Sequence, residues 1–203
     1  YFQPLTQLNI QASHNNKGNL NSIKEIQVST PYQSIYTSVF KQTIVLFLSE
    51  VLSSSIQEEE ENKSLFSYIE TSLIWLDTHD KISNFHLLFL LNLTKFLGFY
   101  PDITESNLEY FNLIEGNFTN STYEKEVISG ENLFHFLKLL GTNFDSIDSI
   151  KFSKRERQQM ESLGLGEITT HLQDLRDDHD NYFSDPFQSR WYRAMINRYV
   201  TVL

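Results

Sequence analysis

The residues best suited to metal chemistry lie close together near the C-terminal end of the sequence. His171 and His179 are two helical turns apart, and the second is surrounded by four carboxylates, those of Asp177, Asp178, Asp180 and Asp185. Hard cations prefer carboxylate oxygens, and imidazole suits zinc and related metals. A metal-dependent helical hydrolase using this cluster near His179 is therefore one hypothesis. Because nothing opposite the cluster completes a site, we favour an exposed acidic loop.

Two other acidic groups are better explained as solvated segments than as metal sites. Four glutamates at positions 58–61 precede a predicted helix, where negative charge is favourable beside the N-terminus. The segment Asp77-Thr78-His79-Asp80 ends that helix, and residues so close together at a helix end rarely converge on one ligand. We interpret both groups as polar loops.

The most basic tetrad of the chain could contact the phosphates of a nucleic acid. It contains Lys154, Arg155 and Arg157 within a predicted helix that starts at Ser153. Its alternative interpretation is a solvated helix face. The whole chain carries 26 acidic and 16 basic residues, a formal net charge of -10. This balance argues against a non-specific nucleic-acid binder, because phosphate contacts require clustered lysine and arginine.

The sequence lacks the common motifs of catalysis and nucleotide binding. Its seven glycines form no phosphate-binding loop, and neither a zinc-protease HExxH nor a GxSxG nucleophile motif is present. Without cysteine there is no disulfide, no thiolate nucleophile and no thiolate metal site. We therefore expect a protein that is not an enzyme and that needs no cofactor.

The stretch from Ser83 to Pro101 predicts the central helix of a mainly α-helical domain. Its leucines and phenylalanines leave almost no polar face, which is typical of a helix buried on most sides. Ser83 is the expected N-cap, and Gly98 and Pro101 end the helix. The apolar run is shorter than the roughly 20 residues that a membrane span requires.

The remaining pattern predicts short β segments at two places and helices elsewhere. Alternating apolar residues at 1–11 and 23–29 flank a turn-forming segment and predict a β-hairpin, and a small β excursion is expected around 108–119. Helices are expected from Thr30-Pro31 to about Ser55, over 64–76, from Ser129 to Gly141, and from Ser153 onward.

Several blocks in this order resemble the RecO family of recombination mediators. They are QPLTQLNI (3–10), LNSIKEIQVSTPY (20–32), FLSEVLSSSIQEEEENKSLFSYIETSLIWLD (47–77), NFHLLFLLNLTKFLGFYPD (84–102) and ISGENLFHFLKLL (128–140). The resemblance implies that residues 1–29 are the last strands of an OB-fold that begins upstream. Residues 30–160 would be a RecO-type helical domain, and residues 161–203 a divergent tail that is helical in part.

The resemblance also implies a function in DNA repair, and the absence of cysteine fits a cytosolic protein best. RecO proteins anneal single-stranded DNA and, with RecR, load RecA on DNA coated by the single-strand-binding protein. Many relatives carry a four-cysteine zinc site, but residues 105–123 contain no cysteine here, so zinc is not expected there. Since the acidic chain lacks most of the OB-fold surface, we expect it to bind single strands weakly.

In the family, the acidic and apolar C-terminal tail of the single-strand-binding protein docks on the helical domain. Such a tail requires an apolar pocket beside a cation. The candidate pocket residues are Phe85, Leu88 and Phe89, and the candidate cations are Lys41, Lys81 and Lys95. A purely structural protein-interaction domain, with RecR or another protein as its sole partner, is the other hypothesis.

Overall fold

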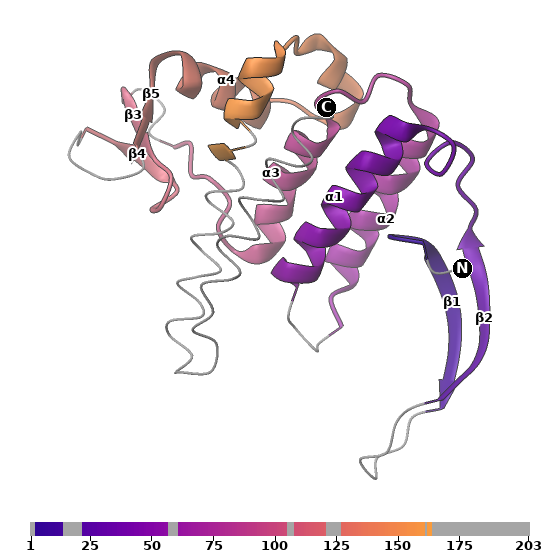
Figure 1. Ribbon diagram of the computed structural model, residues 1–203. Helices are drawn as coiled ribbons and strands as arrows, with labels where there is room; N and C mark the ends of the chain where they lie inside the picture. The colour runs from indigo at the N-terminus through magenta and orange to yellow at the C-terminus, as the bar shows by residue number, and fades with distance from the viewer. Residues whose placement is uncertain are drawn as a thin grey trace, which may run out of the picture.

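The computed structural model describes residues 3–13, 22–56, 61–104, 108–120, 127–160 and 162–163. Within them, helices build the body and strands form two small antiparallel sheets, as the sequence predicts (Figure 1). The Asp/His cluster near His179, and nearly all of the predicted tail 161–203, lie outside the described residues. In the described part, no helix is both long and apolar enough to cross a membrane.

The predicted hairpin is present and extends from one end of the helical body (Figure 1). Strand β1 (Gln7–Ser13) pairs antiparallel with β2 (Ser22–Thr30). Ile10 faces Ile26 across the ladder, and Ile10 and Ile23 are 49% and 55% exposed. Side-chain hydrogen bonds tie the hairpin base to the next segment, among them one between the hydroxyls of Thr6 and Tyr36 and one from the Gln7 amide to the Tyr32 hydroxyl.

Helix α1 (Val39–Ser55) begins eight residues later than the Thr30-Pro31 signal predicted. Its N-cap is Ser38, whose hydroxyl accepts the backbone N–H of Lys41, while Thr30 ends strand β2. A turn over residues 33–37 separates the two elements. The prediction was wrong because that turn is stabilised by the distant Asp77, which a local capping pattern does not reveal.

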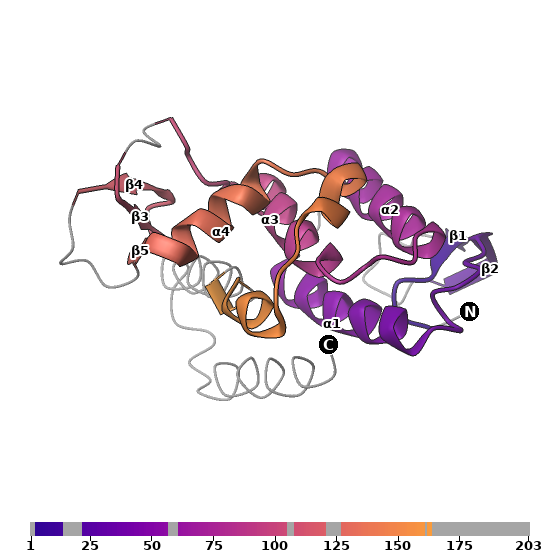
Figure 2. The same ribbon diagram turned by 90° about the horizontal axis from the view of Figure 1, so that it is seen from above.

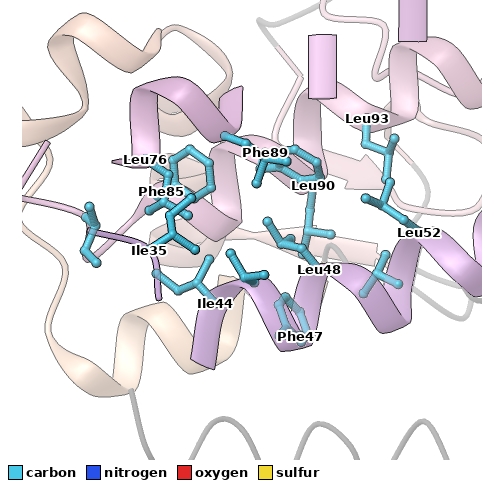
Figure 3. Packing of buried hydrophobic residues seen from close by; sticks show 14 of the residues in the cluster. Ile35, Ile44, Phe47, Leu48, Leu52, Leu76, Phe85, Phe89, Leu90 and Leu93 are labelled. Atoms are coloured by element: carbon cyan, nitrogen blue, oxygen red, sulfur yellow. The ribbon is translucent and has the colours of Figure 1, made fainter. Parts of the chain in front are cut away.

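Helices α1, α2 (Lys63–Thr78) and α3 (Phe85–Leu97) pack together around one hydrophobic cluster (Figures 1 and 3). Ile35 from the turn closes one end of this cluster beside Leu76 and Phe85. Leu90 and Leu93 of α3 meet residues of α1 farther along. The cluster fixes the start of α1 against the end of α2, where the candidate site lies.

Helix α3 is the shared centre that its composition predicts, since it contributes side chains to both hydrophobic clusters of the described chain. Gly98 ends it with a φ of 88°, a left-handed conformation that favours glycine. The predicted N-cap at Ser83 was wrong by one residue. Asn84 has that position, and its side chain does not cap α3: its buried amide donates to the carbonyl of Ile150 and so ties the helix start to the segment after a 3₁₀ helix farther along the chain.

The β excursion has three strands, β3 (Tyr110–Asn112), β4 (Asn117–Thr119) and β5 (Val127–Ser129), in the order β4-β3-β5. It lies at the end of the molecule opposite the hairpin (Figures 1 and 2). Helix α4 (Gly130–Leu140) follows directly and packs Phe136 against Phe111. This sheet and α4 form the second hydrophobic cluster with the other side of α3.

A 3₁₀ helix (Phe144–Ser149) and a helix over residues 154–160 complete the described body. We call the latter the 154–160 helix. Ser153 begins it as predicted: its hydroxyl accepts the N–H of Glu156, and the Glu156 carboxylate accepts the N–H of Ser153. This reciprocal capping box fixes the helix start. Phe152 and Met160 anchor the helix in the second cluster.

Candidate functional site

A buried lysine at the start of α1 is the most unusual charged group of the candidate site. Lys41 is only 4% exposed, and its ammonium donates to the Ser34 hydroxyl at 2.6 Å and to the Asp77 carbonyl at 2.9 Å. An ammonium has three N–H donors, so these two contacts leave one donor for another acceptor. A buried charge requires such partners because leaving it unpaired is costly.

Asp77, the last acidic residue of α2, holds the turn that positions Ser34. Its carboxylate accepts the backbone N–H groups of Gln33, Ser34 and Ile35 at 2.8–2.9 Å. Burial would raise the pKa of Asp77, but these backbone donors outweigh burial and hold the pKa below its ordinary value. The segment predicted as a polar loop therefore organises the site through Asp77.

A pocket of about 300 Å³ opens beside this network. Three apolar side chains line it: Phe40 and Ile44 from α1, and Ile82 from the segment before α3. Phe40 is 60% exposed, whereas Ile44 and Ile82 are buried, with exposed fractions of 1% and 9%. The remaining lining residues are Ser34, Ser38, Lys41, Asp80, Ser83 and Arg157.

Two cations from distant parts of the sequence meet in this pocket. Lys41 comes from α1 and Arg157 from the 154–160 helix. The Arg157 guanidinium donates to the Phe152 carbonyl at 2.7 Å, which holds the side chain against the body. With Asp80 at the rim the three charged lining residues carry a net charge of about +1. An apolar group with a carboxylate next to it would match this lining.

The predicted apolar contacts Phe85, Leu88 and Phe89 are in the core instead of at an open surface. Their exposed fractions are 0%, 1% and 0%. Phe85 stacks on Trp75 and Phe144, and Phe89 packs against Tyr68. None of the three is among the residues that line the pocket, so the prediction that they line it was wrong. A helix that is apolar on nearly every side is buried on nearly every side.

The three predicted cations lie at different places. Lys41 lines the pocket, as described above. The exposed Lys81 pairs with Asp148 at 3.3 Å. Lys95, in the last turn of α3, lies 4.4 Å from the centre of the Tyr100 ring. Neither Lys81 nor Lys95 is among the pocket residues, so the structure brings only Lys41 of these three to the apolar surface.

The basic residues of the tetrad differ in exposure on the 154–160 helix. Lys154 and Arg155 are exposed, while Arg157 is half-buried and turns into the pocket. Their predicted contacts with DNA phosphates stay a prediction. Sequence reasoning missed Phe40, Ile44 and Ile82 as lining residues. A signal for the first was available, because aromatic residues are enriched at protein interfaces.

The chain matches known proteins over most of its length. A family described as "Recombination protein O C terminal" matches residues 37–178. The DNA repair protein RecO of Flavobacterium johnsoniae is 49% identical over 173 residues, which cover 85% of this chain and 72% of that relative. The DNA repair protein RecO of Flavobacterium psychrophilum is 45% identical, again over 85% and 72% of the two chains. The proteins of this name from Christiangramia forsetii and Bacteroides fragilis are 42% and 34% identical.

The family match includes every residue that lines the pocket except Ser34. It starts just before the N-cap of α1 and continues through α2, α3, α4 and the 154–160 helix. The resemblance drawn from the sequence blocks is thereby confirmed, together with the expected mainly α-helical fold. On the family match and the identity of these relatives, the chain belongs to the RecO family.

Proposed function

We propose that this chain acts in recombinational DNA repair as a mediator and that its pocket docks the acidic, apolar C-terminal tail of the single-strand-binding protein. The observation that carries the proposal is the pairing of an apolar lining with Lys41 and Arg157 in one pocket. Apolar residues of the tail would contact Phe40, Ile44 and Ile82. Its carboxylates would accept hydrogen bonds from the two cations.

We assign the DNA-binding part of this function to the hairpin, together with the OB-fold barrel that the hairpin would complete. One face of β1 and β2 carries apolar residues that two strands alone cannot bury, and a two-stranded sheet is marginally stable in isolation. An OB-fold would supply the missing strands, and OB-folds bind single strands through charge and base stacking. The helical domain would then supply protein contacts.

The complete activity requires no bond-breaking step. Annealing of complementary strands, and loading of RecA together with RecR, depend on binding and release. This agrees with the absence of catalytic motifs from the sequence. Docking on the single-strand-binding protein would bring this chain to coated DNA, and the weak contacts of a short tail allow the exchange that loading requires.

Peptide titration tests the docking proposal. A fluorescent peptide with the acidic, apolar tail of the single-strand-binding protein is titrated with the 203-residue chain and its anisotropy is measured. Arg157→Glu and Phe40→Ala change half-buried and exposed side chains, so both variants should fold. Each should weaken binding at least about tenfold, equivalent to about 1.4 kcal/mol.

Matched controls are available on nearby surfaces. Arg155→Glu makes the same charge change two residues away, and Phe134→Ala removes an equally exposed phenylalanine from α4. Both should bind the peptide like the unchanged chain. Equal affinity for Arg157→Glu and Arg155→Glu would refute docking in this pocket. If the chain then bound RecR alone in a pull-down, the structural interaction domain would be the better description.

A further inference from the structure

We propose that Glu131, His135 and Glu156 form a zinc site that joins α4 to the 154–160 helix. This site is separate from the docking pocket and stands independently of the proposed function. Potential ligand atoms of the three side chains all lie within 4.8 Å of one another. Glu131 and His135 are one helical turn apart on α4, and Glu156 reaches them from the second helix.

The environment of His135 points to a ligand. The residue is 9% exposed, and its Nδ1 is buried without a hydrogen-bond partner among the described residues. Its Nε2 lies 3.6 Å from the nearer oxygen of Glu156, beyond ordinary hydrogen-bond distance. Phe152 packs edge-on against the ring at 5.2 Å and fixes it in place. A buried ring nitrogen without a hydrogen-bond partner requires an explanation, and an ion bound by the imidazole is one.

The carboxylate of Glu156 is arranged to serve two partners. Its Oε2 accepts the backbone N–H of Ser153 in the capping box, while Oε1 faces His135. Ligating carboxylates are commonly held by such an additional hydrogen bond.

Zinc is the metal that this set of ligands fits best. Imidazole and carboxylate at about 2.0–2.2 Å are usual zinc ligands, and three protein ligands with a water complete a tetrahedron. The ligand atoms of a tetrahedral site with bonds of those lengths lie about 3.5 Å apart. The distance from His135 Nε2 to Glu156 Oε1 is 3.6 Å, close to that value. Only the exposed Glu131 has to move inward. Magnesium and calcium prefer oxygen ligands alone.

Zinc binding by the tag-free 203-residue chain tests the proposal. Zinc chloride is titrated against the chain in the presence of a chromophoric chelator, and circular dichroism checks the fold of each variant. We expect one zinc equivalent per chain. Glu131→Gln changes an exposed residue and should preserve the fold, yet it should lower zinc affinity at least about tenfold. His135→Gln should abolish binding.

Two control variants locate the bound metal. His79→Gln replaces an exposed histidine at the end of α2 and should bind zinc like the unchanged chain. His179→Gln removes the central histidine of the sequence cluster and should also leave zinc affinity unchanged. Absence of zinc binding would overturn the proposal. It would equally be overturned if Glu131→Gln retained full affinity, or if His179→Gln lost the metal.

Discussion

Replacing Asp77 should unfold the connection between the hairpin and the helical body at a measurable cost. Its carboxylate accepts three backbone N–H groups and also contacts the Ser34 hydroxyl at 3.2 Å. Hydrogen bonds to a charged group contribute about 1.5–3 kcal/mol each, but water replaces part of that where the turn is exposed. We therefore expect Asp77→Ala to lower the free energy of unfolding by about 2–4 kcal/mol.

A second replacement separates charge from hydrogen bonding at this position. Asp77→Asn retains one acceptor oxygen and removes the charge, so about half of the loss should remain. Urea unfolding followed by circular dichroism gives both values, with an unchanged slope if the transition stays two-state. Asp80→Ala is the matched control, because Asp80 is exposed and accepts no hydrogen bond from the turn in the described structure.

The result that would refute this reasoning is a change of less than about 0.5 kcal/mol for Asp77→Ala, the range of ordinary surface substitutions. The turn would then be held by Ile35 in the core alone. The same variant should also weaken tail-peptide binding, because Ser34 and Lys41 depend on the position of the turn. Unfolding and peptide binding are measured separately, so a loss in one does not conceal the other.

Three further predictions concern α3. Burial, together with the charge of Arg157, lowers the pKa of His86 to about 4. Because the unfolded state takes up a proton near pH 6.5, the free energy of unfolding should fall by up to about 3 kcal/mol as the pH drops from about 6.5 to about 4. The urea midpoint of His86→Gln should therefore depend less on pH than that of the unchanged chain. Phe85→Ala should cost about 3–5 kcal/mol in urea unfolding because it opens a cavity beside Trp75, and a cost below about 1 kcal/mol would contradict the packing. Gly98→Ala should lower the melting temperature because its φ of 88° strains any other residue, and an unchanged or higher value would contradict the left-handed cap.

The elements that the sequence predicted well are those governed by local pattern. The apolar run of α3, its end at Gly98 and the helix start at Ser153 depend on residues close in the chain. The start of α1 was wrong because the turn before it is stabilised by Asp77, more than forty residues away. Local sequence patterns predict helices and strands, but they do not show which distant side chain accepts the backbone N–H groups of a turn.

The candidate site was only partly predictable for the same reason. Lys41 was found from charge and position, but Arg157 was assigned to DNA because its neighbours in sequence are basic. Only the fold shows that it turns away from Lys154 and Arg155 toward α1. Likewise, the most apolar residues were proposed as the pocket, although the core uses Phe85 and Phe89 and the pocket uses the partly polar start of α1.

Isoleucine-methyl NMR of the 203-residue chain with the tail peptide tests docking in this pocket most directly. The pocket predicts that the Ile44 and Ile82 methyl signals shift on titration and that Arg157→Glu suppresses the shifts. Ile56 and Ile69 line a different depression between the ends of α1 and α2 and should not respond. Shifts confined to Ile56 and Ile69, with Ile44 and Ile82 unchanged, would contradict the proposed site.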